Sequence, residues 1–263
     1  MTSQNLHTNL GFSHPITAIV VGASGGIGQA WIDYLLSIHH QNHIIATYHN
    51  TQPTYSPSLS PTMKKRLTYY QVDVTSADSI RIIADAIEQL PSPPQLIIYS
   101  SGLLHHPHHP QQPERSLKHI TWEGMQAIFS INAFGFIQAM QILLPYLPRT
   151  QRSICISLSA RVGSIGDNRM GGWYSYRASK AAHNMFFKTA SLEWGRTHKK
   201  GIMLALHPGT VATNLSVPFI SKKYSNRVLT PSESVQYQAK ILCTATPSIH
   251  GKFLAWDGQE IVW

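Results

Sequence analysis

The amino-acid sequence predicts an α/β protein in three layers, with a doubly wound parallel sheet of about seven strands and helices on both faces. Stretches with apolar residues at helical spacing alternate with short apolar runs from one end of the chain to the other. Most of these runs are continuously apolar, which is typical of parallel strands that are covered on both faces. The seven runs are 16–21, 43–48, 68–73, 95–99, 153–158, 202–207 and 252–256.

Length and composition indicate a single globular domain. The chain has 263 residues, 43% of them hydrophobic, and can bury one substantial core. We expect one domain over residues 1–263, with an N-terminal lead at 1–14 and a Pro-rich loop at 51–61. The segment 215–231 follows the sixth strand and is expected to form a lid loop on the substrate side, with a plain surface loop as the alternative.

Charge and apolar runs predict the partners of the chain. The first residues show no cationic start followed by an apolar block, and no apolar run is long enough to span a membrane. We therefore expect a cytoplasmic protein without a membrane partner. The formal charge of +9 would suit a nucleic acid or a phosphate-rich cofactor. Because the cations are scattered and no nucleic-acid-binding motif accompanies them, we expect no nucleic-acid partner.

The histidines and cysteines predict no metal site. Four histidines crowd into "HHPHHP", but the prolines break any helix that would place the rings on one face. No cysteine or carboxylate completes a ligand set there. Cys155 and Cys243 lie far apart with no motif around them, so we expect two reduced thiols. The four histidines are His105, His106, His108 and His109.

A glycine-rich segment, "VVGASGGIGQA", follows the first predicted strand and opens the first helix. Glycines at this place let the backbone approach a pyrophosphate, and the helix amino end offers free N–H groups and partial positive charge. A purely structural turn is the alternative, and the strand–turn–helix context favours a dinucleotide site in a Rossmann-type fold. The residues expected to bind the cofactor here are Gly22, Ser24, Gly26, Ile27 and Gly28.

The end of the second strand indicates which dinucleotide is preferred. A carboxylate there would hold the adenosine ribose of NAD, but the sequence reads "ATYHN" without an acid. His49, with Lys64, Lys65 and Arg66, is instead expected to face a 2′-phosphate, so NADP is favoured over NAD. Asp73, followed by Val74, closes the third strand, where its carboxylate could accept a hydrogen bond from the adenine amino group. Capping of the next helix is the alternative for Asp73.

The segment "YSYRASK" holds a tyrosine–lysine pair. Tyr176 and Lys180 are four residues apart and share one face of a helix, whereas Tyr174 and Lys180 point away from each other. A cation about 5 Å from a phenol favours the phenolate by roughly 3 kcal/mol at an effective dielectric of about 20. We therefore expect Lys180 to lower the pKa of Tyr176 by about two units, towards the range useful for acid–base chemistry.

Several ordered motifs resemble those of the short-chain dehydrogenase/reductase family, over essentially the whole chain. They are "GASGGIG", "VDV" at 72–74, "INAFG", "YRASK" and "HPGTVAT" at 207–213. The segment "SARVGSIGDNRMGGWYSYRASKAA" and the ending "GKFLAWDGQEIVW" are similar to the branch that contains the C-factor proteins and the sniffer-type carbonyl reductases.

The resemblance implies a role for individual residues. Tyr176 would be the acid/base, and Lys180 would bind the nicotinamide ribose and lower the pKa of the tyrosine. Asn132 would hold a water that links Lys180 to solvent; a core amide bonded to backbone is the alternative. Thr213 would bond the nicotinamide carboxamide. The remaining residues expected at the cofactor are Gly102, Pro208, Gly209 and Val211.

Two departures from the family pattern bear on the site. The family usually has "NNAG" after the fourth strand, where this chain has "YSSG" at 99–102. The pattern Ser-x-x-Gly that supplies the family's catalytic serine would place Ala160 in the serine position. Since a serine is needed to polarise the substrate carbonyl, we expect Ser159 to fill the role, with Ser164 as the second candidate.

The sequence thus predicts an NAD(P)-dependent oxidoreductase that moves a hydride between the nicotinamide and a small or medium carbonyl or alcohol substrate. The alternative is a cofactor-binding signalling or regulatory protein with little turnover, which the two departures motivate. The family resemblance implies a homodimer or homotetramer. Leu103, Trp173, Tyr174 and Phe219 could line an apolar substrate pocket, and packing in the core is the alternative for each.

Overall fold

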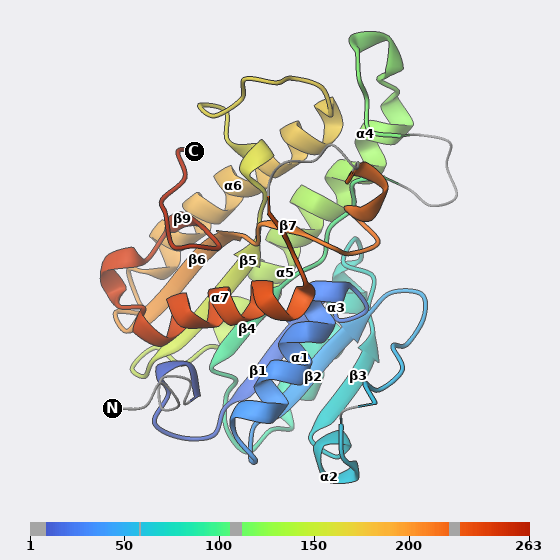
Figure 1. The fold of residues 1–263 in the computed structure, drawn as a ribbon. Coiled ribbons are helices and arrows are strands. Elements are labelled where there is room, and N and C mark those ends of the chain that lie inside the picture. The colour runs from blue at the N-terminus through green and yellow to red at the C-terminus, as the bar shows by residue number, and fades with distance from the viewer. Residues whose placement is uncertain (1–8, 58, 106–111, 221–226) are drawn as a thin grey trace.

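Seven parallel strands form the central sheet, in the order β3-β2-β1-β4-β5-β6-β9 (Figure 1). The computed structural model describes residues 9–57, 59–105, 112–220 and 227–263. The predicted fold class is confirmed, and each predicted apolar run overlaps one strand, although β3 and β6 each begin one residue before the predicted run. The strands are β1 (Thr17–Val21), β2 (His43–Tyr48), β3 (Leu67–Gln71), β4 (Leu96–Tyr99), β5 (Ser153–Leu158), β6 (Gly201–His207) and β9 (Lys252–Ala255).

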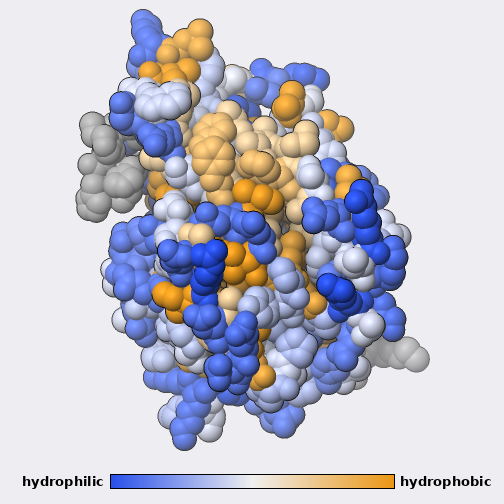
Figure 2. Space-filling view, turned by 180° about the vertical axis from the view of Figure 1, so that it is seen from behind, coloured by the Kyte–Doolittle hydropathy of each residue, from blue (hydrophilic) through white to orange (hydrophobic). Residues whose placement is uncertain are grey.

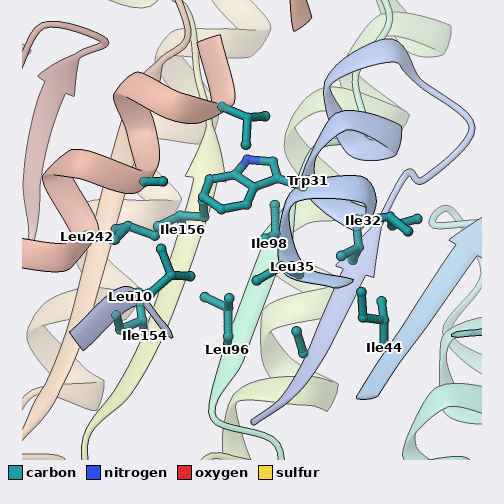
Figure 3. Close-up of a cluster of buried hydrophobic side chains, with 14 of the residues drawn as sticks. Leu10, Trp31, Ile32, Leu35, Ile44, Leu96, Ile98, Ile154, Ile156 and Leu242 are labelled. Atoms are coloured by element: carbon teal, nitrogen blue, oxygen red, sulfur yellow. The ribbon is translucent and has the colours of Figure 1, made fainter. Parts of the chain in front are cut away.

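Helices cover both faces of the sheet. Helices α1 (Gly26–Ile38) and α7 (Pro231–Thr244) pack on one face, and α3 (Ala77–Glu88), α5 (Gly135–Leu143) and α6 (Tyr174–Trp194) on the other (Figure 1). Each face encloses its own apolar cluster, and Figure 3 shows the α1 side, where Trp31 lies over the strands. The indole of Trp31 also donates to the Gln238 amide of α7 at 3.3 Å, which joins the two helices.

The strand order places a crevice at the carboxyl edge of the sheet. Strand β1 pairs with β2 on one side and with β4 on the other. The chain therefore winds outward in both directions from β1, and the loops after β1 and β4 diverge to opposite faces of the sheet. In open α/β sheets, this switch point is where ligands bind.

The helix that follows β4 contains one turn of π-helix. Helix α4 (Trp122–Phe129) continues through the π-turn Ser130–Phe134 into α5. The run Trp122–Tyr146 is the one helical segment in the described part of the chain that is long and apolar enough to cross a membrane. Half of its apolar window is buried inside the protein, because the run packs against α3 and α6. This burial is what a core helix shows.

The predicted loops differ from the structure at their ends. Pro61 starts the short helix α2 (Pro61–Lys64), which the Ser60 hydroxyl caps by accepting from the Met63 amide. The predicted lid 215–231 contains strand β8 (Val228–Leu229), which pairs with β7 (Thr210–Val211), and its last residue begins α7; residues 221–226 lie outside the described residues. The signal for that helix start was readable: Thr230 and Glu233 form a capping box behind Pro231.

The described part of the N-terminal lead is integrated into the core. Leu10 is fully buried and Phe12 almost so, and their turn packs against α7. Arg152 fixes this turn, since its guanidinium donates to the carbonyls of Leu10, Leu242 and Ala245. The lead is therefore part of the domain from Asn9 onward.

Candidate active site

The turn after β1 and the start of α1 leave no room for a side chain at Gly22 or Gly28. A Cβ at Gly22, whose φ is +86°, would lie 2.6 Å from the Ser101 hydroxyl, and one at Gly28 would lie 2.4 Å from the Gly22 carbonyl oxygen. The Ser100 hydroxyl donates to the carbonyls of Val21 and Gly22 at 2.8 and 3.2 Å, so it ties β4 to this turn. Thus the "YSSG" segment still supports the glycine turn although it lacks the family asparagines.

A cavity of about 230 Å³ opens beside this turn, at the carboxyl ends of β1 to β4. Helix α1 starts here at Gly26, and its amino end has no side-chain cap. The predicted cofactor residues that line the cavity are Gly22, Ser24, His49, Asp73, Val74 and Gly102. A glycine turn and a helix amino end without a side-chain cap, both beside a cavity, suit the phosphates of a dinucleotide.

The turn after β6 reaches the glycine turn from the other side. Thr213 lies against the start of α1, because its methyl group would be 2.9 Å from a Cβ at Gly26. Gly209, with a φ of +84°, turns the chain at the end of β6 so that the segment can return towards β1. The structure therefore brings Thr213, at the end of the "HPGTVAT" segment that also holds Pro208 and Val211, next to Gly26, which Ile27 and Gly28 follow in α1.

The side chains of His49 and Asp73 face each other in the cavity. The His49 imidazole lies 3.8 Å from the Asp73 carboxylate; His49 is exposed and Asp73 is partly exposed. Burial alone would raise the pKa of Asp73, but hydrogen bonds from the Thr75 amide and hydroxyl and the nearby His49 lower it. The helix cap at this place is Ser76, so Asp73 does not cap α3.

The prediction for Lys64, Lys65 and Arg66 is wrong. These residues precede β3 and lie at the amino edge of the sheet, opposite the cavity at its carboxyl edge. The Arg66 guanidinium donates to the carbonyls of Leu36, His39 and Asn42 at the end of α1, at 3.0 to 3.1 Å. The sequence did not show that the loop between β2 and α2 carries the chain back from the carboxyl edge to the amino edge of the sheet.

Tyr176 and Lys180 are both buried on α6. Tyr176 is 7% exposed and Lys180 3%, whereas Tyr174 is 37% exposed, as the helical spacing predicts. The Lys180 ammonium donates to the Leu158 carbonyl at the end of β5, at 2.9 Å. Burial lowers the pKa of Lys180 to about 8.

The expected lowering of the Tyr176 pKa is wrong for this structure. Burial of the phenol raises its pKa above the ordinary value. Desolvation penalises the phenolate, and no lowering by Lys180 offsets it. The phenol is therefore protonated at neutral pH.

Asn132 lies in the π-turn and is fully buried. Its amide accepts from the Leu103 N–H at 2.7 Å and donates to the Leu103 carbonyl at 2.8 Å and to the Ser179 hydroxyl at 3.0 Å. A Cβ at Gly102 would lie 3.5 Å from the Asn132 oxygen and 3.6 Å from the Lys180 nitrogen. The segment after β4, the π-turn and α6 thus meet at one point.

Comparison with known proteins agrees with this geometry. A family model described as short chain dehydrogenase matches residues 16–223.

The chain belongs to the short-chain dehydrogenase family.

Individual relatives fall in the branch that the motifs indicate. The chain is 29% identical to C-signal of Myxococcus xanthus over 149 residues, 56% of this chain and 84% of the relative. It is 28% identical to 1-hydroxy-2-glutathionyl-2-methyl-3-butene dehydrogenase of a Rhodococcus species over 193 residues, 73% and 78% of the two chains. NADPH-bound carbonyl reductase from chicken fatty liver superposes with a TM-score of 0.78 at 25% identity, over 95% of this chain and 100% of that one.

The serines near the short-chain dehydrogenase site have definite partners. The Ser159 hydroxyl donates to the Asn184 amide oxygen of α6 at 2.6 Å and is buried. The Ser164 oxygen accepts from the Asp167 amide at 3.1 Å, which leaves its own proton available. Ala160, in the family's serine position, precedes a short turn at 161–163.

An aromatic wall adjoins Tyr176. The ring centroid of Trp173 lies 6.2 Å from that of Tyr176 and 5.3 Å from that of Phe219, and both ring pairs are nearly edge to face. Trp173 has a φ of +52°, and Gly171 and Gly172 before it also have positive φ values. Such a conformation is strained for a bulky residue and occurs where surrounding contacts impose it.

Sequence reasoning missed two buried residues beside the site. The Glu114 backbone carbonyl accepts from the Trp173 N–H at 2.5 Å, and its carboxylate accepts from the amide and hydroxyl of Ser175. No local signal in the sequence links positions 61 residues apart. His183 is fully buried and bonds Asn132 and Ser157. His183 follows Lys180 by three residues, and this spacing could have shown from the sequence that the two side chains share a helix face.

The predicted absence of a metal site concerns residues that are only partly described. His105 packs its ring against that of Phe219 at 5.5 Å, while His106, His108 and His109 lie outside the described residues. Within the described ranges, no three His, Cys, Asp or Glu side chains gather closely enough to hold a metal ion.

The burial of Lys180 predicts a pH-dependent cost to stability. The folded protein releases the Lys180 proton near pH 8, whereas the unfolded chain holds it until about pH 10.4. Stability contributed by this residue therefore rises as the pH rises between those values. At pH 7, Lys180→Met should raise the free energy of unfolding by roughly 2 kcal/mol, and this advantage should shrink towards pH 10.

Urea unfolding of both proteins at pH 7, 8.5 and 10 measures this difference. The exposed Lys118→Met variant is the control and should match the wild type at all three pH values. A Lys180→Met variant that is less stable than the wild type at pH 7, or a difference that does not change with pH, would contradict the account.

Proposed function

We propose that this protein is an NADP-dependent reductase of small or medium carbonyl compounds. The observation that carries the proposal is the meeting of Lys180 and Asn132 at Gly102, which lines the cavity together with Gly22 of the glycine turn; Tyr176 is buried one turn before Lys180 on α6. When bound there, the nicotinamide supplies the hydride that adds to the carbonyl carbon. The protein's own residues must then deliver one proton to the carbonyl oxygen.

Tyr176 is the proposed proton donor. Because burial raises its pKa, the phenol carries its proton at neutral pH and can give it to the alkoxide that develops on the substrate. The reverse reaction would need a phenolate, which the buried site disfavours, so we propose reduction as the favoured direction. Lys180, with a pKa of about 8, is suited both to hold the nicotinamide ribose and to return a proton to Tyr176.

Asn132 is proposed to order the interior next to Lys180. Its amide is bonded to Leu103 and Ser179 and lies next to Gly102. The role of holding a water that links Lys180 to solvent belongs to this proposal. The Asn132 side chain contributes two donors and an acceptor at a place where a buried ammonium needs polar neighbours.

The preference for NADP is proposed from the end of β2. No carboxylate follows this strand, and His49 is the basic side chain of the cavity. The carbonyl reductase from chicken, at 25% identity, was solved with NADPH. Pro208, Gly209, Val211 and Thr213 are proposed to hold the nicotinamide half.

The substrate is proposed to bind against the aromatic wall of Trp173 and Phe219. Phe219 lies in the short turn 217–219 of the predicted lid, and Leu103 follows β4 on the cavity side. These apolar surfaces adjoin Tyr176, the proposed proton donor. They suit an aldehyde or ketone with an apolar or aromatic substituent.

A signalling role with little turnover is the second candidate. The similarity to C-signal and the presence of Ala160 in the family's serine position favour it. In that case the cavity would bind the dinucleotide without a hydroxyl to polarise a carbonyl. Turnover distinguishes the two functions.

Self-association is proposed from the outer surface of α5 and α6. Phe134, Met185 and Leu192 expose more than half of their surface and stand on the same side of the sheet. Figure 2 shows apolar surface gathered on the face opposite α1 and α7. Such a patch suits an interface between two copies of the chain, as in a homodimer or homotetramer.

The first prediction from the proposed function concerns turnover. The wild type should oxidise NADPH in the presence of aromatic or aliphatic aldehydes and ketones, followed as loss of absorbance at 340 nm. Tyr176→Phe should lose at least about 100-fold in kcat, because it removes the proton donor. Its Kd for NADPH should stay within about twofold, since the phenol contributes little to binding. Turnover that survives in Tyr176→Phe would refute the mechanism, and NADPH binding without any turnover would favour the signalling role.

The second prediction concerns the serine. We propose that Ser159 polarises the substrate carbonyl, which requires its hydroxyl to turn away from Asn184 when substrate binds. Ser159→Ala should then lower kcat about 100-fold, the effect of removing one oxyanion donor. Ser164→Ala is the matched control and should change kcat by less than about threefold. The opposite ranking of the two variants would transfer the role to Ser164.

The third prediction concerns the dinucleotide. His49→Asp places a carboxylate at the end of β2, where it repels a 2′-phosphate and accepts from ribose hydroxyls. The ratio of kcat/KM for NADPH to that for NADH should fall at least about tenfold. Arg66→Met should leave this ratio unchanged while lowering stability, because Arg66 binds only the end of α1. An unchanged ratio in His49→Asp would place the phosphate elsewhere.

A further inference from the structure

His183 stands at the centre of a buried polar network next to the proposed acid/base residues. It lies on α6, one turn after Lys180, and its side chain is fully buried. Its Nδ1 is 2.9 Å from the Asn132 backbone carbonyl, and its Nε2 is 2.8 Å from the Ser157 hydroxyl. Its ring packs on that of Phe136 with centroids 4.0 Å apart. Three elements, β5, α6 and the π-turn, are thereby joined through one imidazole.

The hydrogen bonds fix the tautomer of this imidazole. A carbonyl oxygen can only accept, so Nδ1 carries the proton that is donated to Asn132. Burial, followed by the charge of Lys180, lowers the pKa of His183 well below its usual value, although the bond to Asn132 opposes this. The ring is therefore neutral, and Nε2 accepts the proton of the Ser157 hydroxyl.

The Asn132 carbonyl is at a place where the helix ladder is irregular. In the π-turn the Gly135 amide bonds back to Ser130, five residues earlier, so the α-helical pattern is interrupted there. A buried backbone carbonyl in such a turn needs a partner. His183 supplies it, and the same residue, Asn132, presents its side-chain amide to Leu103 and Ser179.

We infer that His183 is the positioning residue of the acid/base centre: it holds the π-turn at the Asn132 carbonyl and so aims the Asn132 amide at the Leu103 backbone beside Lys180. This inference rests on the proposed reductase function for its kinetic consequence. The placement of Asn132 itself does not depend on that function. His183 touches neither the cavity nor the acid/base tyrosine directly, so it acts through Asn132.

Substitution at His183 separates positioning from simple core packing. His183→Leu removes both hydrogen bonds and should lower kcat about tenfold or more while KM stays within about twofold. His183→Gln keeps one donor and one acceptor and should recover most of kcat. His198→Leu is the matched control. His198 is also buried and bonded to a backbone carbonyl, but it lies at the opposite edge of the sheet, so this variant should lose stability and retain kcat.

A second readout is independent of turnover. The Leu103 amide donates to the Asn132 side-chain oxygen, so its hydrogen exchange reports whether that amide is held in place. Exchange at Leu103 should be at least about tenfold faster in His183→Leu than in the wild type, with the amide of Ile45 in β2 unchanged in the same sample. If His183→Leu does not fold, Ser157→Ala, which frees Nε2, should show a smaller increase of about threefold.

The outcomes separate the two proposals. A wild type without turnover but with the exchange increase would refute the reductase function and keep the positioning role. Slower turnover with unchanged exchange at Leu103, or a folded His183→Leu variant with wild-type kcat and wild-type exchange, would overturn the inference. Equal loss of kcat in His183→Leu and His198→Leu would also overturn the inference, because any loss of core packing would then be enough to lower kcat.

Discussion

The burial of the Lys180 ammonium is the constraint on which the site depends. A cation in the interior needs polar neighbours and free space around its head group, and the surrounding elements supply both. Leu158 at the end of β5 offers its carbonyl, and Gly102 after β4 lies beside the Lys180 nitrogen. A side chain at Gly163 would collide with the Lys180 backbone and Cβ. Gly102, Gly163 and the end of β5 therefore all lie against Lys180.

The same constraint relates the irregular helix to the chemistry. The π-turn shifts the register between α4 and α5 by one residue, and this brings the Asn132 amide next to Gly102 and Lys180. The strained backbone at Trp173, held by Glu114, fixes the entry to α6 and sets the indole against Tyr176. Regular elements carry the fold, and local departures from regularity place the reactive groups.

The sequence predicted the elements whose signals are local. Strand runs, the glycine turn, the spacing of Tyr176 and Lys180, and the family all followed from periodicity and motif order. Predictions that needed distances across the sheet failed: Arg66 lies at the wrong edge, and burial reverses the expected direction of the Tyr176 pKa shift. The partners of Asn132 and the contact of Glu114 with Ser175 join distant positions, and no helical or strand period records them.

A crystal structure with NADP⁺ tests the central claim most directly. The account predicts the pyrophosphate at the glycine turn, the 2′-phosphate beside His49, and the nicotinamide ribose within hydrogen-bond distance of Lys180, about 3 Å. The ring would then lie between Tyr176 and the segment after β6. A dinucleotide bound with its nicotinamide away from Tyr176 and Lys180, or bound outside the cavity at β1 to β4, would contradict it.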